Sequence, residues 1–159
     1  MQSISGYIAF RDTAIVPEAA SSRSIFRSCG IRLRHRAAVK LKILVKSAWG
    51  SDDPTKAAFP FLHSDALSDA GHEVQIFLLG EAVSLMRKSV ANAVVPVGWP
   101  PLSEVLSKIV TKKIPIYACG ACSRARGLTE ADLTEYGAKF GNPKIFVSLV
   151  EWSDKIITE

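Results

Sequence analysis

From residue 41 to the end of the chain, short apolar runs alternate with segments whose apolar residues recur at helical spacing. An apolar run of about four to eight residues, bounded by Gly, Pro or polar residues, is typical of a buried strand. Such runs predict strands at residues 41–46, 73–79, 114–119 and 155–158. Residues 90–97 fit either a strand or an ordered loop.

Helical spacing and capping residues predict helices between these strands. Asp53 is a candidate cap for a helix that begins at Pro54, and Gly71 is a candidate left-handed end for the same helix. Thr129 and Asp132 fit a capping box. Helices are therefore predicted at residues 54–70, 81–88, 101–109 and 143–152, with a short one after Thr129.

The alternation of strands and helices predicts an α/β fold. We expect a single three-layer α/β/α domain with a mainly parallel sheet of about five strands, because right-handed crossovers place helices on both faces. Ligands of such sheets bind beyond the carboxyl ends of the strands. This rule draws attention to the turns at residues 48–53 and 80–81, and to the segment after residue 119.

Composition and charge narrow the class of protein. The chain has 159 residues, of which 48% are hydrophobic, and this is enough for one domain with a packed core. No window approaches the apolar length of a membrane span, so we expect no membrane partner. The net charge of +5 arises in residues 1–40, which hold seven basic and two acidic residues. The remaining charges cancel, which argues against a nucleic-acid partner.

Residues 1–38 differ from the rest in composition. They lack clear periodicity and are rich in Arg and Ser, so we predict a disordered basic extension, with the folded domain at residues 39–159. A translation start assigned too early and an organelle transit peptide both fit this segment, and the first is favoured. Three cysteines without a secretory signal indicate a reducing compartment, and we expect the cytoplasm.

The segment after the third predicted strand is the best candidate for chemistry. Cys119 stands where a strand becomes a loop, near free backbone N–H groups. Those groups, or a cation such as Arg124 or Arg126, would stabilise a thiolate, which is the nucleophilic form of cysteine. Gly120 allows a sharp turn and leaves room for an incoming group. We therefore predict that Cys119 is a reactive thiol.

These residues resemble the cysteine loop of the DsrE/TusD family. The resemblance rests on C-G-A-C-S-R-A-R-G-L at residues 119–128, and on W-G-S-D-D-P-T-K-A, G-H-E-V and I-F-L-L-G-E-A-V earlier in the chain. The resemblance covers about residues 41–158. The chain resembles the stand-alone DsrE-like proteins more than the subunits of a sulfur relay complex. The resemblance implies a persulfide on Cys119, a trimer or hexamer, and a sulfur donor or acceptor protein as partner.

The position of Cys119 and the family resemblance together predict a sulfur carrier or sulfurtransferase-like protein. Such a protein needs no metal or organic cofactor. Cys122 completes a C-x-x-C pair and leaves a dithiol redox protein open, although no helix is clearly organised around the pair. A non-catalytic binding or assembly module with an inert cysteine also remains open. One C-x-x-C cannot supply four zinc ligands, so we predict no metal site.

Three other side chains are candidates for binding substrate near the cysteine. Arg126 is a candidate for orienting an anionic sulfur group, and pairing with an acidic side chain is an equal alternative. Glu81 follows the second predicted strand and is a candidate for lining the pocket. Trp49 follows the first strand and is a candidate for its wall.

Overall fold

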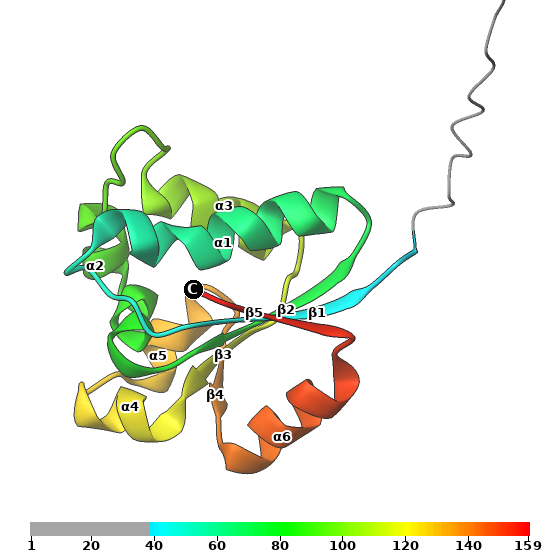
Figure 1. The fold of residues 1–159 in the computed structure, drawn as a ribbon. Coiled ribbons are helices and arrows are strands. Elements are labelled where there is room, and N and C mark those ends of the chain that lie inside the picture. Colours follow the sequence, from blue (N-terminus) through cyan, green and yellow to red (C-terminus); the bar gives the residue numbers. More distant parts are fainter. Residues whose placement is uncertain (1–38) are drawn as a thin grey trace, which may run out of the picture. The chain divides into compact units, whose positions relative to one another are not determined.

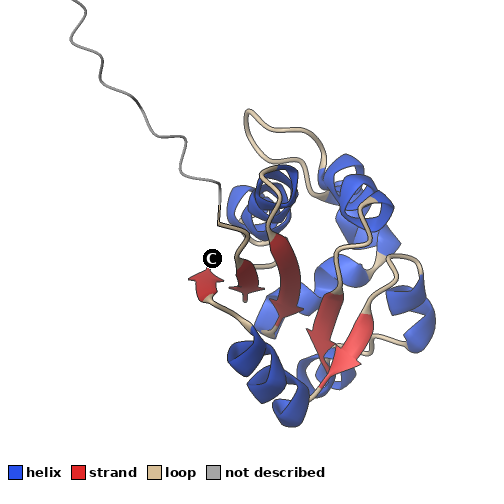
Figure 2. Cartoon of the chain, turned by 90° about the vertical axis from the view of Figure 1, so that its right-hand side faces the viewer, coloured by secondary structure: helices blue, strands red, loops and turns tan. Residues whose placement is uncertain are grey.

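The computed structural model describes residues 39–159, and the predicted basic extension at residues 1–38 lies outside them. The strands are β1 (Lys42–Ser47), β2 (Glu73–Leu78), β3 (Ile116–Cys119), β4 (Lys139–Gly141) and β5 (Lys155–Thr158). They form one five-stranded sheet in the order β4-β3-β2-β1-β5, and every neighbouring pair is parallel. The strands pass through the middle of the domain with helices on either side (Figure 2).

Helices cover both faces of this sheet, which confirms the three-layer α/β/α fold. They are α1 (Pro54–Asp69), η1 (Gly80–Met86), α2 (Lys88–Ala93), α3 (Leu102–Thr111), α4 (Gly120–Ala125), α5 (Glu130–Thr134) and α6 (Pro143–Trp152). Helices α1 and α3 lie together over one face, and α6 lies against the other (Figure 1). Among the described residues, no helix is both long and apolar enough to cross a bilayer.

The two faces of the sheet carry cores of very different size. Successive side chains of a strand point to opposite faces, so Ile43 and Val45 join the large cluster beneath α1 and α3, while Leu44 points toward α6. The cluster on the α6 side has three buried members, Leu44, Phe77 and Leu149. Most of the buried apolar area, and hence most of the hydrophobic stabilisation, belongs to the α1 and α3 side.

The predicted ends of α1 and α5 are confirmed. The Asp53 carboxylate accepts a hydrogen bond from the Lys56 N–H at 3.0 Å, and Gly71 adopts a φ of 88° just beyond the helix. Thr129 and Asp132 form both hydrogen bonds of a capping box. These local signals were readable because each depends on residues that are close in sequence.

Two elements differ from the sequence-based prediction, and the alternative left open for residues 90–97 is resolved. The helix expected at residues 81–88 is a 3-10 helix at residues 80–86, followed by the separate helix α2. Residues 90–97 contain no strand: they finish α2 and continue into a loop. The fifth strand is β4, which the pattern did not reveal, because three residues with one buried position give no readable alternation.

Candidate functional site

Cys119 lies at the carboxyl edge of the sheet, at the end of the interior strand β3. It stands at the N-cap position of α4, which begins with Gly120 and contains Cys122. The prediction that no helix is organised around the cysteine pair is therefore wrong. A side chain at Gly120 would bring its Cβ to 3.1 Å from the carbonyl oxygen of Gly141, so the glycine permits the turn to approach β4 closely.

The surroundings of Cys119 favour its thiolate. Partial burial raises the pKa of this thiol. Four groups lower it by a larger amount: the Cys122 N–H, the Cys122 thiol, the Ala121 N–H and the charge of Arg124. The net result is a pKa below that of an ordinary thiol. A larger share of Cys119 is then ionised at neutral pH, which increases its nucleophilic population.

Cys122 connects the cysteine turn to the neighbouring strand. Its Sγ accepts a hydrogen bond from the backbone N–H of Gly80 at 3.3 Å. Gly80 follows β2 and has a φ of 55°, a conformation that favours glycine. Within the described residues, both Cys119 and Cys122 are free thiols, and each is half-buried.

Arg126 and Glu81 form an ion pair at the surface beside this turn. The guanidinium contacts both carboxylate oxygens, with 3.1 Å between Nε and Oε2. It also donates to the carbonyl oxygen of Cys122 at 3.2 Å. The hydrogen bond with Arg126 is the main reason that the pKa of Glu81 is lowered. Arg126 is thus paired with Glu81, and the arginine whose charge acts on Cys119 is Arg124.

Trp49 lies in the loop after β1, at the carboxyl edge of the sheet. Its ring is partly exposed and the Lys56 ammonium sits 3.9 Å from the ring centroid. The adjacent Gly50 packs tightly on Glu81, since a Cβ there would lie 2.7 Å from the Glu81 Cβ. The loop therefore reaches the Glu81 turn, but Trp49 does not line the pocket that opens beside Cys119.

That pocket has a volume of about 260 Å³ and an apolar lining. Its residues come from the ends of β2 and β3 and from the start of α6: Phe77, Leu79, Cys119, Asn142, Pro143 and Phe146. The rings of Phe77 and Phe146 are 5.1 Å apart at their centroids. Apart from Cys119, none of these residues was predicted from the sequence. The alternation of β2 could have shown that Phe77 points away from the main core, but not that α6 would meet it.

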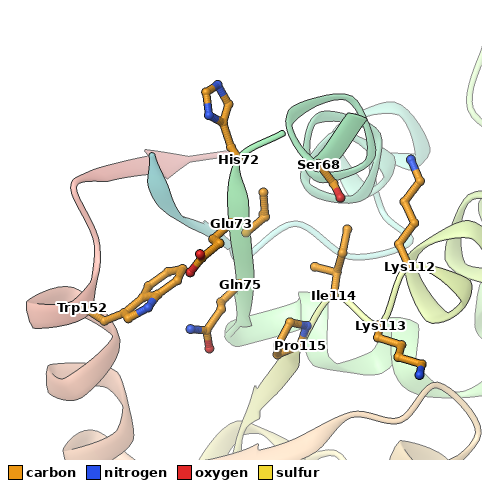
Figure 3. Close-up of a pocket in the computed structure, with 10 residues that line it drawn as sticks. Ser68, His72, Glu73, Gln75, Lys112, Lys113, Ile114, Pro115 and Trp152 are labelled. Atoms are coloured by element: carbon orange, nitrogen blue, oxygen red, sulfur yellow. The ribbon is translucent and has the colours of Figure 1, made fainter. Parts of the chain in front are cut away.

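A second cavity of about 320 Å³ lies at the opposite edge, by the amino ends of β2 and β3 (Figure 3). His72, Gln75 and Trp152 are among its lining residues. Lys112 also lines it, but its ammonium is bound to the carboxylates of Asp65 and Asp69. This cavity contains no thiol. Across residues 39–159, no group of three or more His, Cys, Asp or Glu side chains could hold a metal ion.

The charge of Arg124 gives a prediction about the pH dependence of Cys119. Only the thiolate is alkylated, so the pH of half-maximal reaction with iodoacetamide should lie below that of a free thiol. Arg124→Gln should move this midpoint upward. Arg126→Gln removes the same charge two residues away and should move it less, because Arg126 is not among the groups that lower the pKa of Cys119. Peptide mass mapping follows Cys119 alone, and equal midpoints for the two variants would contradict the assignment.

The fold and the site define a class of protein: a small α/β/α domain in which an interior parallel strand ends in a thiol of lowered pKa. The chain belongs to the DsrE/DsrF-like family, whose model matches residues 41–158. The resemblance seen in the sequence is thus confirmed.

Two curated relatives come from archaea. The uncharacterized protein MK0008 of Methanopyrus kandleri is 37% identical over 87 residues, which is 55% of this chain and 68% of the relative. The uncharacterized protein MJ0989 of Methanocaldococcus jannaschii is 35% identical over 88 residues, or 55% and 73%.

Two solved structures share the fold. The YchN protein of E. coli has a TM-score of 0.62 at 16% identity, covering 76% of this chain and 99% of that one. The protein MTH1491 of Methanobacterium thermoautotrophicum, whose function is unknown, has a TM-score of 0.53 at 15% identity, covering 76% and 100%. At these identities the likeness extends to the fold alone.

Proposed function

We propose that the protein is a sulfur carrier that holds sulfane sulfur as a persulfide on Cys119. Membership in the DsrE/DsrF-like family indicates a role of the sulfur-relay type. The observation that carries the finer proposal is the placement of Cys119, whose pKa is lowered at a strand end that opens into a pocket. A nucleophilic and accessible thiol is what persulfide chemistry requires.

The transfer is a sequence of two displacements. The Cys119 thiolate attacks the terminal sulfur of a donor R–S–S–H, a new S–S bond forms, and the donor leaves as R–S⁻ with the electron pair of the broken bond. An acceptor thiolate then attacks the same terminal sulfur, and Cys119 leaves as a thiolate. The Ala121 and Cys122 N–H groups and Arg124 stabilise that thiolate as nucleophile and as leaving group. Neither displacement requires a metal or an organic cofactor.

Intact mass measurement tests this function. Incubation of the full chain with a persulfide donor should add one sulfur atom, and a thiol reductant should remove it. We further propose that the carrier acts in the cytoplasm, a reducing compartment, with a protein as its sulfur donor or acceptor. A chain that gains no sulfur under conditions in which a small free thiol does would contradict the proposal.

A dithiol redox function is the second candidate, and the proximity of the two thiols favours it. The Cys122 thiol is one of the groups that lower the pKa of Cys119, so the two side chains are within interaction range. Oxidation would then join them in a disulfide and remove two hydrogen atoms instead of adding sulfur. Intact mass after exposure to oxidised glutathione distinguishes this product from a persulfide.

We also propose that the chain forms a trimer or hexamer. The α6 side of the sheet presents Val147, Val150 and Ile156 to solvent, and these are candidates for a subunit contact. Sedimentation at micromolar concentration should give three or six times the chain mass of 17.2 kDa. Val147→Lys should shift the population toward monomer, and a wild-type chain that is already monomeric would refute the proposal.

A further inference from the structure

We propose that the sulfur donor of Cys119 presents an uncharged, apolar group to the pocket formed by Phe77, Leu79, Cys119, Asn142, Pro143 and Phe146. This inference rests on the proposed sulfur-carrier function and adds the class of donor. The sequence suggests a different donor, an anionic sulfur compound oriented by Arg126. The structure offers no such arrangement on the pocket side of Cys119, as the lining and the two arginines show.

The lining of the pocket is the first observation. Phe77, Leu79 and Phe146 supply carbon surface, and Pro143 adds a ring without an N–H donor. Asn142 is the one lining residue with a side-chain amide. Its oxygen is occupied as the cap of α6, where it accepts the Ile145 N–H at 2.9 Å. An anion in this pocket would exchange part of its water for carbon surface, with no cationic side chain in the lining to compensate, which is unfavourable.

The positions of the arginines are the second observation. Arg126 is engaged with the Glu81 carboxylate and the Cys122 carbonyl oxygen, and it does not line the pocket. Arg124 acts on Cys119 from the α4 side, with Nη1 3.5 Å from where a Cβ of Gly120 would lie. Neither arginine is among the residues that line the pocket. The charge of Arg124 favours the Cys119 thiolate, and the charge of Arg126 is engaged by Glu81.

The geometry of displacement connects the pocket with the donor. The attacking sulfur, the transferred sulfur and the leaving sulfur lie roughly in line during thiolate exchange. The group R of a donor R–S–S–H therefore extends away from Cys119 Sγ as R–S⁻ departs. The cavity beside Cys119 is available for that group, and a volume of about 260 Å³ accommodates an aromatic or branched aliphatic side chain. Contact between R and the lining then accelerates transfer.

Two small donors that differ in the group R test the inference. The full chain is mixed with freshly generated phenylmethyl persulfide or carboxymethyl persulfide, and the rate at which Cys119 gains sulfur is followed by mass spectrometry. Each rate is divided by the rate of the same donor with 2-mercaptoethanol, which removes intrinsic reactivity. The normalised preference for the phenylmethyl donor should be about tenfold or more, the scale on which apolar pockets discriminate.

Two variants locate the preference in the pocket. Leu79→Lys places an ammonium in the lining and should lower the preference at least about tenfold, with a gain in the carboxymethyl rate. Ser148→Ala alters an exposed residue of α6 outside the lining and should leave both rates unchanged. Thermal unfolding confirms that each variant is folded, and Phe146→Ala gives a second, uncharged change of the lining if Leu79→Lys does not fold.

The outcomes separate the inference from the function on which it rests. A preference that Leu79→Lys or Phe146→Ala reduces supports the inference. Equal normalised rates for the two donors, or faster transfer from carboxymethyl persulfide, overturn it and leave the sulfur carrier intact. If neither donor adds sulfur to Cys119 faster than to 2-mercaptoethanol, both the sulfur-carrier function and the inference fail.

Discussion

Cys119→Ser will abolish the gain of a sulfur atom from a persulfide donor, whereas Cys122→Ser will retain most of it. The reason is that Cys119 has the lowered pKa and lines the pocket, whereas Cys122 does not line it. Serine keeps the size of the side chain but is a far weaker nucleophile at neutral pH. Intact mass of the wild type and both variants, recorded after the same incubation, measures the difference.

Cys29→Ser is the matched control for this pair, because it removes the third cysteine, which lies outside the described residues. It should gain sulfur as the wild type does. Equal loss in Cys119→Ser and Cys122→Ser would favour the dithiol function instead. A wild-type chain whose cysteines react no faster than a free thiol would indicate a binding or assembly module that has the family fold without the chemistry.

Phe61→Ala will lower the free energy of unfolding by about 3–5 kcal/mol. Phe61 belongs to α1 and is fully buried in the large cluster between that helix and the sheet. Truncation removes the buried ring and leaves a cavity that a packed core refills only in part. Urea denaturation followed by circular dichroism measures the change.

Phe59→Ala provides the control on the same helix. Phe59 is only partly buried and stacks on His63, with ring centroids 5.4 Å apart. Its truncation removes the same atoms from a more solvent-exposed position. The free energy of unfolding should therefore fall by less than half as much as in Phe61→Ala. Similar losses for the two variants would contradict the assignment of the larger effect to the complete burial of Phe61.

The sequence predicted the central strands because each is an apolar run with distinct ends. Strands β1 and β2 contain successive buried residues and are therefore covered on both faces, while β3 alternates between buried and half-buried positions. Strands covered on both faces read as continuous apolar segments. Strand β4 escaped prediction because its place depends on distant contacts. A Cβ at Gly141 would lie 2.7 Å from the Phe77 ring, a proximity of residues 64 positions apart that no local pattern reports.

The candidate site was predictable only in part for the same reason. Cys119 is marked by a strand end and a following glycine, both of which are local. Local sequence does not show which arginine acts on Cys119, Arg124 or Arg126. The Glu81 carboxylate that pairs with Arg126 belongs to the distant turn after β2. The pocket was missed because Phe77 and Phe146 come from separate elements whose contact follows from the chain path through β4 and α6.

The unequal division of the core bears on how such a protein can evolve. The cluster beneath α1 and α3 holds most of the buried residues, whereas the pocket residues Phe77, Leu79 and Phe146 belong to the small cluster under α6. Substitutions on the α6 side can therefore alter the choice of partner molecule while most of the folding free energy is kept. For the proposed sulfur carrier, a change of donor then requires only a few substitutions near α6, without first accumulating stabilising mutations elsewhere.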